Sequence, residues 1–264
     1  MVLHYREYKS ILSAKNGMNI YRGCSHGCIY CDSRSLCYQI NHEFTDIEIK
    51  LNAPGMLEHE LKHKRKKCMI ATGSMCDPYI HIEDEIMYTR KCLQLIDKYR
   101  FGLSILTKSN KILRDLDILK SINAKTKCVV QMTLTTADEK LCKIIEPNVS
   151  TTRERFEALK IFRDNGIPTV VWLSPFLPFI GVTLRDGNRE YFYKKLDEHF
   201  FGMKQKYIKE FGNSYECHSQ NNSKLMNILY SECDKYKILC KTDKVFSYLS
   251  EFEDKQINEQ VSLF

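Results

Sequence analysis

Three cysteines in this chain lie close enough together to hold one inorganic group. Cys24, Cys28 and Cys31 have the spacing CxxxCxxC. Their thiolates are ligands for zinc and for iron, and all three can reach one small object only if the chain loops around it. Gly23 and Gly27 supply the backbone freedom that such a loop needs. The sequence therefore predicts a metal-binding loop.

Two kinds of metal centre suit this loop. A zinc site needs a fourth ligand, for which His26 and Cys37 are the candidates. Zinc sites usually pair two CxxC knuckles that are far apart in the sequence, and this chain has no second knuckle. An iron–sulfur cluster held by three cysteines leaves one iron open to bind another molecule.

The whole-chain composition suits an intracellular setting for this chemistry. The 264 residues include 12 cysteines, the N-terminus has no apolar signal core, and no run of 18 apolar residues occurs. We therefore expect a cytoplasmic protein with no membrane association, in which clustered cysteines bind metal rather than form disulfides. The formal charge of +7 suits a polyanionic partner.

Short apolar strands alternate with helices along most of the chain. Strands are predicted at residues 68–72, 103–107, 128–134 and 169–174, and helices at residues 57–66, 83–99, 110–123 and 153–165. This alternation is typical of parallel βα units. Because no dinucleotide-binding fingerprint is present, we expect an α/β barrel or partial barrel, with its active site at the carboxyl ends of the strands.

The alternation stops near residue 185. Helices are predicted at residues 189–211, 224–236 and 245–254, and we expect them to pack beside the barrel. The predicted division is a barrel core over residues 1–184, a helical extension over residues 185–256 and a flexible tail over residues 257–264.

Polar residues lie at the ends of three successive predicted strands, at residues 68–72, 103–107 and 128–134, which are counted as the second, third and fourth strands of the barrel. Ser74 and its neighbours, after the second strand, can accept hydrogen bonds from an ammonium group. Lys108, after the third strand, can neutralise a carboxylate. Thr133 and its neighbours on the fourth strand present hydroxyls that can reach a ribose. A solvated loop is the alternative interpretation of each position taken singly, but their joint placement favours one site.

The chain resembles a known family in these same segments. The three cysteines, with Tyr30 just before the last, resemble the signature of the radical S-adenosylmethionine (SAM) enzymes. The segments LTKSNKILRDLDILK, TLTTADEKLCKIIEP, RERFEALKIFRDNGIP and SPFLPF resemble, in the same order, proteins of the spore photoproduct lyase type. The remainder, from GVTLRDGNREYFY to GNSYEC, is similar to the branch called radical SAM mobile pair protein B.

The resemblance implies a partial (β/α) barrel, a [4Fe-4S] cluster and SAM as cofactors, and an electron-donating partner such as flavodoxin or ferredoxin. It implies that Cys24, Cys28 and Cys31 bind three irons and that SAM binds the fourth. For SAM, it implies these contacts: Tyr30 near the adenine, Ser74 or Cys76 at the amino group, Lys108 at the carboxylate and Thr133 at the ribose. SAM is then cleaved to methionine and a 5′-deoxyadenosyl radical that takes a hydrogen atom from the substrate.

Two departures from the lyase pattern stand out. The lyase uses a cysteine after its second strand as hydrogen donor, whereas Ser74 takes that place here. Cys76 is the nearest thiol and our candidate catalytic residue, with packing or SAM contact as the alternative role. In addition, Phe179 and Ile180 run directly into Gly181, so that about one helix–strand unit of the family is absent. Such a barrel is expected to have an exposed sheet edge.

The substrate is the least determined feature. The charge and the lyase resemblance favour DNA repair, with weak support from the basic run at residues 63–67. The last five residues resemble the peptide that docks repair proteins on the DNA sliding clamp, although a tail folded back on the protein is equally compatible; they are Gln260, Val261, Ser262, Leu263 and Phe264. The alternatives are a radical SAM enzyme that modifies a protein or small molecule, and a shortened, non-catalytic protein that binds a cluster or zinc.

Overall fold

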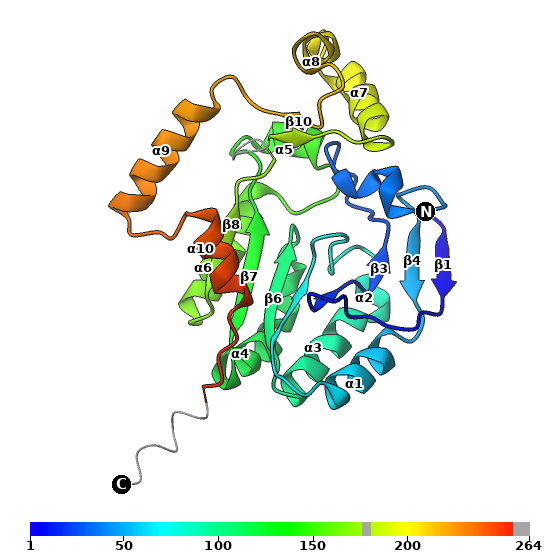
Figure 1. The fold of residues 1–264 in the computed structure, drawn as a ribbon, viewed down its shortest axis with the longest axis vertical. Coiled ribbons are helices and arrows are strands. Elements are labelled where there is room, and N and C mark those ends of the chain that lie inside the picture. Colours follow the sequence, from blue (N-terminus) through cyan, green and yellow to red (C-terminus); the bar gives the residue numbers. More distant parts are fainter. Residues whose placement is uncertain (176–180, 256–264) are drawn as a thin grey trace.

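A five-stranded parallel sheet forms the centre of the computed structural model, which describes residues 1–175 and 181–255 (Figure 1). Its spatial order is β2 (Gly17–Met18), β5 (Met69–Thr72), β6 (Gly102–Thr107), β7 (Cys128–Thr133) and β8 (Thr169–Trp172). Every neighbouring pair is parallel, so the carboxyl ends of all five strands share one edge of the sheet. This arrangement confirms the predicted α/β partial barrel.

Helices cover one face of this sheet because alternate strand residues are apolar. Leu103 and Ile105 on β6 and Val130 on β7 are fully buried in the main core. They share this core with residues of α1 (Ala53–His63), α3 (Tyr88–Lys98), α4 (Leu116–Lys125) and α6 (Thr152–Asp164). A capping box, in which Thr151 and Glu154 bond each other's backbone N–H groups, begins α6. No helix in the described ranges combines the length and the apolar character that crossing a bilayer requires.

Two predicted helices are each divided in the structure. The helix expected over residues 83–99 breaks at Met87, whose φ of 54° separates α2 (Glu83–Ile86) from α3. The helix expected over residues 189–211 breaks at Gly202, whose φ of 74° separates α7 (Asn188–His199) from α8 (Met203–Phe211). A left-handed residue cannot continue a right-handed helix, and apolar periodicity alone does not reveal such a residue.

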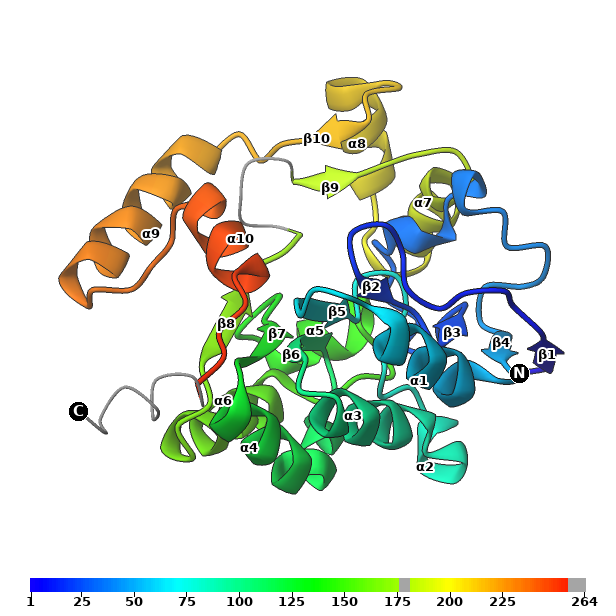
Figure 2. The ribbon, with the colours of Figure 1, turned by 60° about the horizontal axis from the view of Figure 1, so that its bottom comes forward.

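Several short elements were not predicted, because they are too short to show a periodic pattern. They comprise a second sheet of order β1 (Leu3–Arg6), β4 (Ile47–Lys50) and β3 (Tyr21–Arg22), the pair β9 (Val182–Thr183) and β10 (Glu216–Cys217), the helix α5 (Glu139–Ile145), and 3₁₀ turns at Asp32–Arg34 and Leu36–Tyr38. The helix expected over residues 110–123 begins as a 3₁₀ helix at Asn110–Asp115 and continues as α4. The second sheet stands beside the main sheet at the β2 side (Figure 2).

The C-terminal helices are α9 (Asn222–Lys235) and α10 (Thr242–Ser250). Figure 2 shows α10 on the side of the sheet opposite α3, α4 and α6. There Leu249 packs with Met69 and Val129, and the rings of Phe246 and Trp172 lie 5.4 Å apart. Within the described residues β8 pairs only with β7, so β8 is an edge strand of the sheet. An edge of this kind was expected from the absence of one helix–strand unit. The helix α10 covers the sheet face next to that edge.

Candidate active site

The cysteine loop follows β3 and is held on both sides by backbone hydrogen bonds. Cys24 N–H donates to the carbonyl of Phe44 at 2.9 Å, and Ile29 N–H donates to that of Ile145, at the end of α5, at 3.0 Å. Gly23 has a φ of +79°, and a Cβ there would lie 2.3 Å from the carbonyl oxygen of Asp46. Only glycine fits this position, so the loop conformation is built into the sequence.

The three motif cysteines experience different surroundings: burial raises the pKa of Cys28 and of Cys31, and the nearby Lys108 charge opposes that rise in both. Cys24 and Cys28 are buried, Cys31 is half-buried, and none is in a disulfide. A hydrogen bond with the Cys76 thiol is the largest influence on Cys24 and lowers its pKa to about 6. The thiolate is the form that binds iron, and of the three cysteines Cys24 is the one whose surroundings favour it; the other two would depend on Lys108 and on the metal itself.

The two candidate fourth ligands of a zinc site have other partners. The buried His26 places Nδ1 3.5 Å from a carboxylate oxygen of Asp77. The exposed Cys37 accepts a hydrogen bond from Arg185 Nη1 at 3.4 Å. In residues 1–175 and 181–255, no group of three or more His, Cys, Asp or Glu side chains is placed to hold a metal ion. A cluster differs from a single ion in that each thiolate binds a different iron, so its sulfurs need not converge on one point.

Asp77 joins the loop after β5 to the end of β6. Its carboxylate accepts hydrogen bonds from Thr107 Oγ1 at 2.8 Å, from Lys108 N–H at 2.7 Å and from Tyr79 N–H at 2.8 Å. It is also the carboxylate that faces His26. One buried side chain therefore sets the relative position of the cysteine loop, the Ser74–Cys76 segment and Lys108.

Lys108 faces the negative groups of the site. Burial alone would lower its pKa, but the charges of Cys28, Glu146 and Cys31 raise it above its ordinary value. Its Nζ lies 5.8 Å from the centre of the Tyr30 ring. The Tyr30 hydroxyl donates to Glu146, so the edge of this ring is tied to the end of α5. Lys108 is thus a fixed cation beside the cysteine loop.

Glu146 and Arg155 form an ion pair that is completely removed from solvent. Arg155 Nη2 lies 2.8 Å from Glu146 Oε2, and Nη1 donates to the carbonyl of Thr133 at 2.6 Å. Thr135 Oγ1 donates to the other carboxylate oxygen at 2.8 Å. Burial alone would raise the pKa of Glu146, but Lys108 and Arg155 lower it. Sequence reasoning missed this pair, and the available signal was Arg155, which lies at helical spacing from the buried Ala158, Leu159 and Phe162 of α6.

The structure brings most of the sequence-predicted site residues to one end of the sheet. Cys76 is buried against Cys24, and Ser74 is exposed on the same loop. Thr133 is buried at the end of β7, and its carbonyl is held by Arg155. The roles of these residues toward SAM stay predictions.

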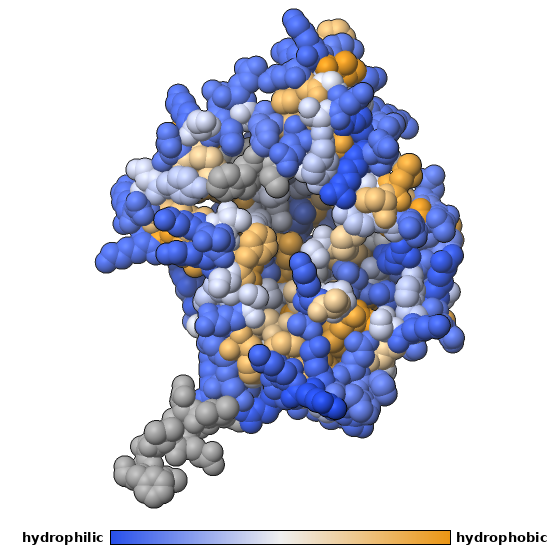
Figure 3. All heavy atoms as spheres, in the orientation of Figure 1, coloured by the Kyte–Doolittle hydropathy of each residue, from blue (hydrophilic) through white to orange (hydrophobic). Residues whose placement is uncertain are grey.

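The basic run at residues 63–67 lies at the other end of the sheet. It precedes β5, whose carboxyl end leads into the Ser74–Cys76 loop. Lys64, Lys66 and Lys67 border a surface cavity there, together with Phe252 after α10. Figure 3 shows strongly hydrophilic residues along this lower end of the molecule. The run is therefore separated from the cysteine loop by the length of the strands.

Comparison with known proteins identifies the superfamily to which the chain belongs. The model of the radical SAM superfamily matches residues 18–184, so the chain belongs to that superfamily. An uncharacterized protein of Methanocaldococcus jannaschii is 36% identical over 170 residues, which cover 64% of this chain and 62% of that protein. An uncharacterized protein of Mycobacterium tuberculosis is 29% identical over 167 residues, which cover 61% and 49%. The matched segment thus spans half to three fifths of these relatives.

The fold is similar to that of spore photoproduct lyase complexed with dinucleoside spore photoproduct. The TM-score is 0.51 at 14% identity, over 80% of this chain and 58% of the lyase chain. The chain is thus a member of the radical SAM superfamily, whose enzymes use a [4Fe-4S] cluster and SAM. When bound, these cofactors supply a 5′-deoxyadenosyl radical through one-electron cleavage of the C5′–S bond of SAM. The superfamily and the fold leave the substrate open.

Proposed function

We propose that this enzyme acts on DNA in a repair reaction of the spore photoproduct lyase type, with Cys24, Cys28 and Cys31 as the cluster ligands. The observation that carries the proposal is the meeting of these three thiols with Cys76 and Lys108 at the carboxyl end of the sheet. The fold similarity to a lyase complexed with a dinucleoside photoproduct and the net charge of +7 support DNA as the substrate.

Under this proposal, different residues around the cysteine loop contact different parts of SAM. Lys108 supplies a fixed cation for its carboxylate, Ser74 an exposed hydroxyl for its amino group, and Thr133 a contact to its ribose. Tyr30 offers a ring near the adenine and is oriented by Glu146. These side chains orient the cofactor and keep water from the reacting carbon, which is what a radical reaction requires of the protein.

Cys76 has two candidate roles. As a hydrogen donor it would give the hydrogen atom of its thiol to the product radical, as the lyase cysteine does. As a packing residue it would only donate a hydrogen bond to Cys24. We favour the role of hydrogen donor, because this thiol is 6% exposed and lies against Cys24, a proposed cluster ligand. Solvent therefore cannot compete with the thiol as the source of the hydrogen atom.

Partners and location belong to the same proposal. A flavodoxin or ferredoxin would reduce the cluster, in the cytoplasm. Docking on the sliding clamp would use Gln260 to Phe264, which lie outside the described residues.

Anaerobic reconstitution tests the proposal directly. With iron, sulfide and dithionite, we expect a brown protein that cleaves SAM to 5′-deoxyadenosine. Added to ultraviolet-irradiated DNA, it should restore thymines, whereas unirradiated DNA of the same sequence should be unchanged. SAM cleavage without any change in the lesion, together with DNA binding no stronger than binding to heparin, would contradict the DNA proposal. That result would favour a protein or small-molecule substrate.

A further inference from the structure

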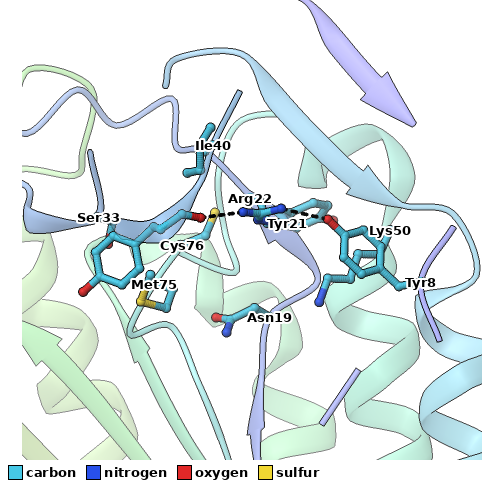
Figure 4. Close-up of a pocket in the computed structure, with 11 residues that line it drawn as sticks. Tyr8, Asn19, Tyr21, Arg22, Ser33, Ile40, Lys50, Met75 and Cys76 are labelled. Atoms are coloured by element: carbon cyan, nitrogen blue, oxygen red, sulfur yellow. Dashed lines mark hydrogen bonds between the residues drawn. The ribbon is translucent and has the colours of Figure 1, made fainter. Parts of the chain in front are cut away.

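A cavity of about 290 Å³ opens beside Cys76, between the second sheet and the loop after β5 (Figure 4). Tyr8, Asn19, Arg22, Lys50, Met75 and Cys76 are among the residues that line it. We call it the Lys50 pocket. Its size is at the lower end of the usual range for ligand sites, roughly 300 Å³, so it suits one chemical group of a larger molecule. None of the SAM contacts proposed above, apart from Cys76, lines it.

Lys50 is a largely buried cation with no carboxylate at ion-pair distance among the described residues. It ends β4 and is 8% exposed. Its Nζ lies 4.6 Å from the centre of the Tyr8 ring, and it makes no hydrogen bond or ion pair within residues 1–175 and 181–255. Figure 4 shows its side chain extending toward Asn19. Burial and the nearby Arg22 charge lower its pKa, and the charges of Glu48 and Glu60 only partly oppose them. A buried ammonium without a partner is unfavourable, so the position favours an anion.

The other charged groups of the pocket already have partners. Arg22 donates to the carbonyls of Tyr38 at 2.7 Å and Gln39 at 3.1 Å, and to the Tyr8 hydroxyl at 3.1 Å. The nearby carboxylate of Glu48 accepts from the Tyr8 hydroxyl and is 3.3 Å from Arg6 Nε. These contacts hold the wall of the pocket in place, and they leave the Lys50 ammonium as the group that faces the cavity unpaired.

A second group in the pocket lacks a partner. Asn19 Oδ1 is buried and accepts no hydrogen bond from the described residues. It leads from β2 toward the cysteine loop, on the side of the cavity opposite Lys50 (Figure 4). A complementary ligand therefore carries an oxyanion for Lys50 and a hydroxyl or N–H donor for Asn19. A nucleotide has both, in its phosphate and in its sugar or base.

We propose that the Lys50 pocket binds a phosphate group of the substrate. This inference rests on the proposed action on DNA and adds to it a contact point next to the reaction centre. Lys50 donates to a phosphate oxygen, Arg22 adds a second positive charge, and Asn19 accepts from the adjoining nucleoside. Because Cys76 lines the pocket and contacts Cys24, a nucleotide anchored there lies next to the candidate hydrogen donor.

Binding of small nucleotides to the reconstituted protein, with SAM present and no reductant, tests the inference. The probes are thymidylyl-thymidine, the same dinucleoside with a neutral methylphosphonate link, and thymidine 5′-monophosphate. The variants are Lys50→Met and Lys50→Arg. The matched control is Lys66→Met, which removes one charge at the opposite end of the sheet. Calorimetry gives the affinity, and iron content and SAM affinity show whether each variant is intact.

We expect Lys50→Met to weaken binding of the phosphate probes by about tenfold, the size of one charge-assisted hydrogen bond, and to leave the neutral dinucleoside unaffected. Lys50→Arg should retain most of the affinity, and Lys66→Met all of it. A preference for the dinucleoside over the monophosphate identifies an internal phosphodiester as the ligand, and the reverse identifies a terminal phosphate.

Equal binding by wild type and Lys50→Met, or no binding of any probe, overturns the inference. A loss of SAM affinity in Lys50→Met also overturns it, because the pocket would then serve the SAM carboxylate. Failure of the proposed function has a different signature: nucleotides bind in a Lys50-dependent manner, but irradiated DNA is not repaired.

Discussion

Charged residues gather at both ends of the five-stranded sheet, in opposite surroundings. At the carboxyl end, Glu146 and Arg155 have side chains with no solvent exposure, and Asp77 is 8% exposed. At the amino end, the lysines of the basic run are largely exposed; Lys67, for example, donates to the carbonyl of Tyr99. Charged side chains are thus buried in ion pairs and hydrogen bonds at the carboxyl end and largely exposed at the amino end.

This difference in the burial of charged side chains distinguishes the candidate site from the surface at the amino end. Removing one member of a buried pair leaves a charge without compensation, which costs several kcal/mol, whereas an exposed lysine contributes little. A buried charge network is also rigid, so it can orient a cofactor. The carboxyl end is therefore where substitutions should change chemistry, and the amino end is where they should be tolerated.

The largest effect is expected at the cysteine loop. Replacement of Cys24, Cys28 or Cys31 by alanine should reduce the iron content after reconstitution to background and abolish SAM cleavage, because under the proposed ligand assignment each thiolate binds its own iron. Cys37→Ala is the control and should retain both. Iron analysis and the ultraviolet–visible spectrum measure the outcome. Full iron content in a Cys28→Ala protein would contradict the ligand assignment.

Arg155→Met should destabilise the fold by about 3–5 kcal/mol, because it leaves the Glu146 carboxylate buried without its partner. Urea unfolding measures this difference. Arg163→Met, on the same helix but with a side chain that is 66% exposed, should change the free energy of unfolding by less than about 0.5 kcal/mol. Equal effects of the two substitutions would remove the contrast between buried and exposed charges.

Asp77→Asn should weaken SAM binding and destabilise the fold by about 1–3 kcal/mol, because an amide cannot accept all the hydrogen bonds that the carboxylate accepts. Asp84→Asn, at an exposed position paired with Lys111, is the control. Calorimetric titration with SAM and urea unfolding measure the two effects. Unchanged SAM affinity would show that Asp77 does not position Lys108.

Glu146 should make stability depend on pH in the acid range. Its pKa in the folded protein lies below its ordinary value of 4.5, so its contribution is full above pH 4.5 and is lost as the pH falls through the lowered value. Wild type should therefore lose more stability than Glu146→Gln between about pH 5 and pH 3. The exposed Glu157→Gln should follow the wild-type curve. Parallel curves for wild type and Glu146→Gln would exclude this linkage.

The smallest effect is expected at the amino end. Lys66→Met should leave SAM cleavage unchanged and alter the free energy of unfolding by less than about 0.5 kcal/mol. If it also lowers lesion repair, the basic run holds the substrate, and the separation of the two ends fails. Repair of irradiated oligonucleotides at several salt concentrations provides this measurement.

The sequence was informative wherever the pattern is local. The cysteine spacing and the alternation of apolar strands with helices depend on neighbouring residues, and they predicted the superfamily and the fold class. The breaks at Met87 and Gly202 were missed because a left-handed residue does not disturb apolar periodicity. The packing of α10 across the sheet face was missed because no local sequence pattern indicates which surface of the protein an apolar helix will cover.

By itself, then, the sequence determined the cysteine loop, the order of the strands along the chain and the expectation that the site would lie at the carboxyl ends of the strands. Only the tertiary structure decided which distant charges meet. Glu146 pairs with Arg155, Asp77 bonds Lys108 and faces His26, and Lys50 lies in a pocket beside Cys76. These contacts join different elements, and each depends on burial, which arises from packing and cannot be read at any single position.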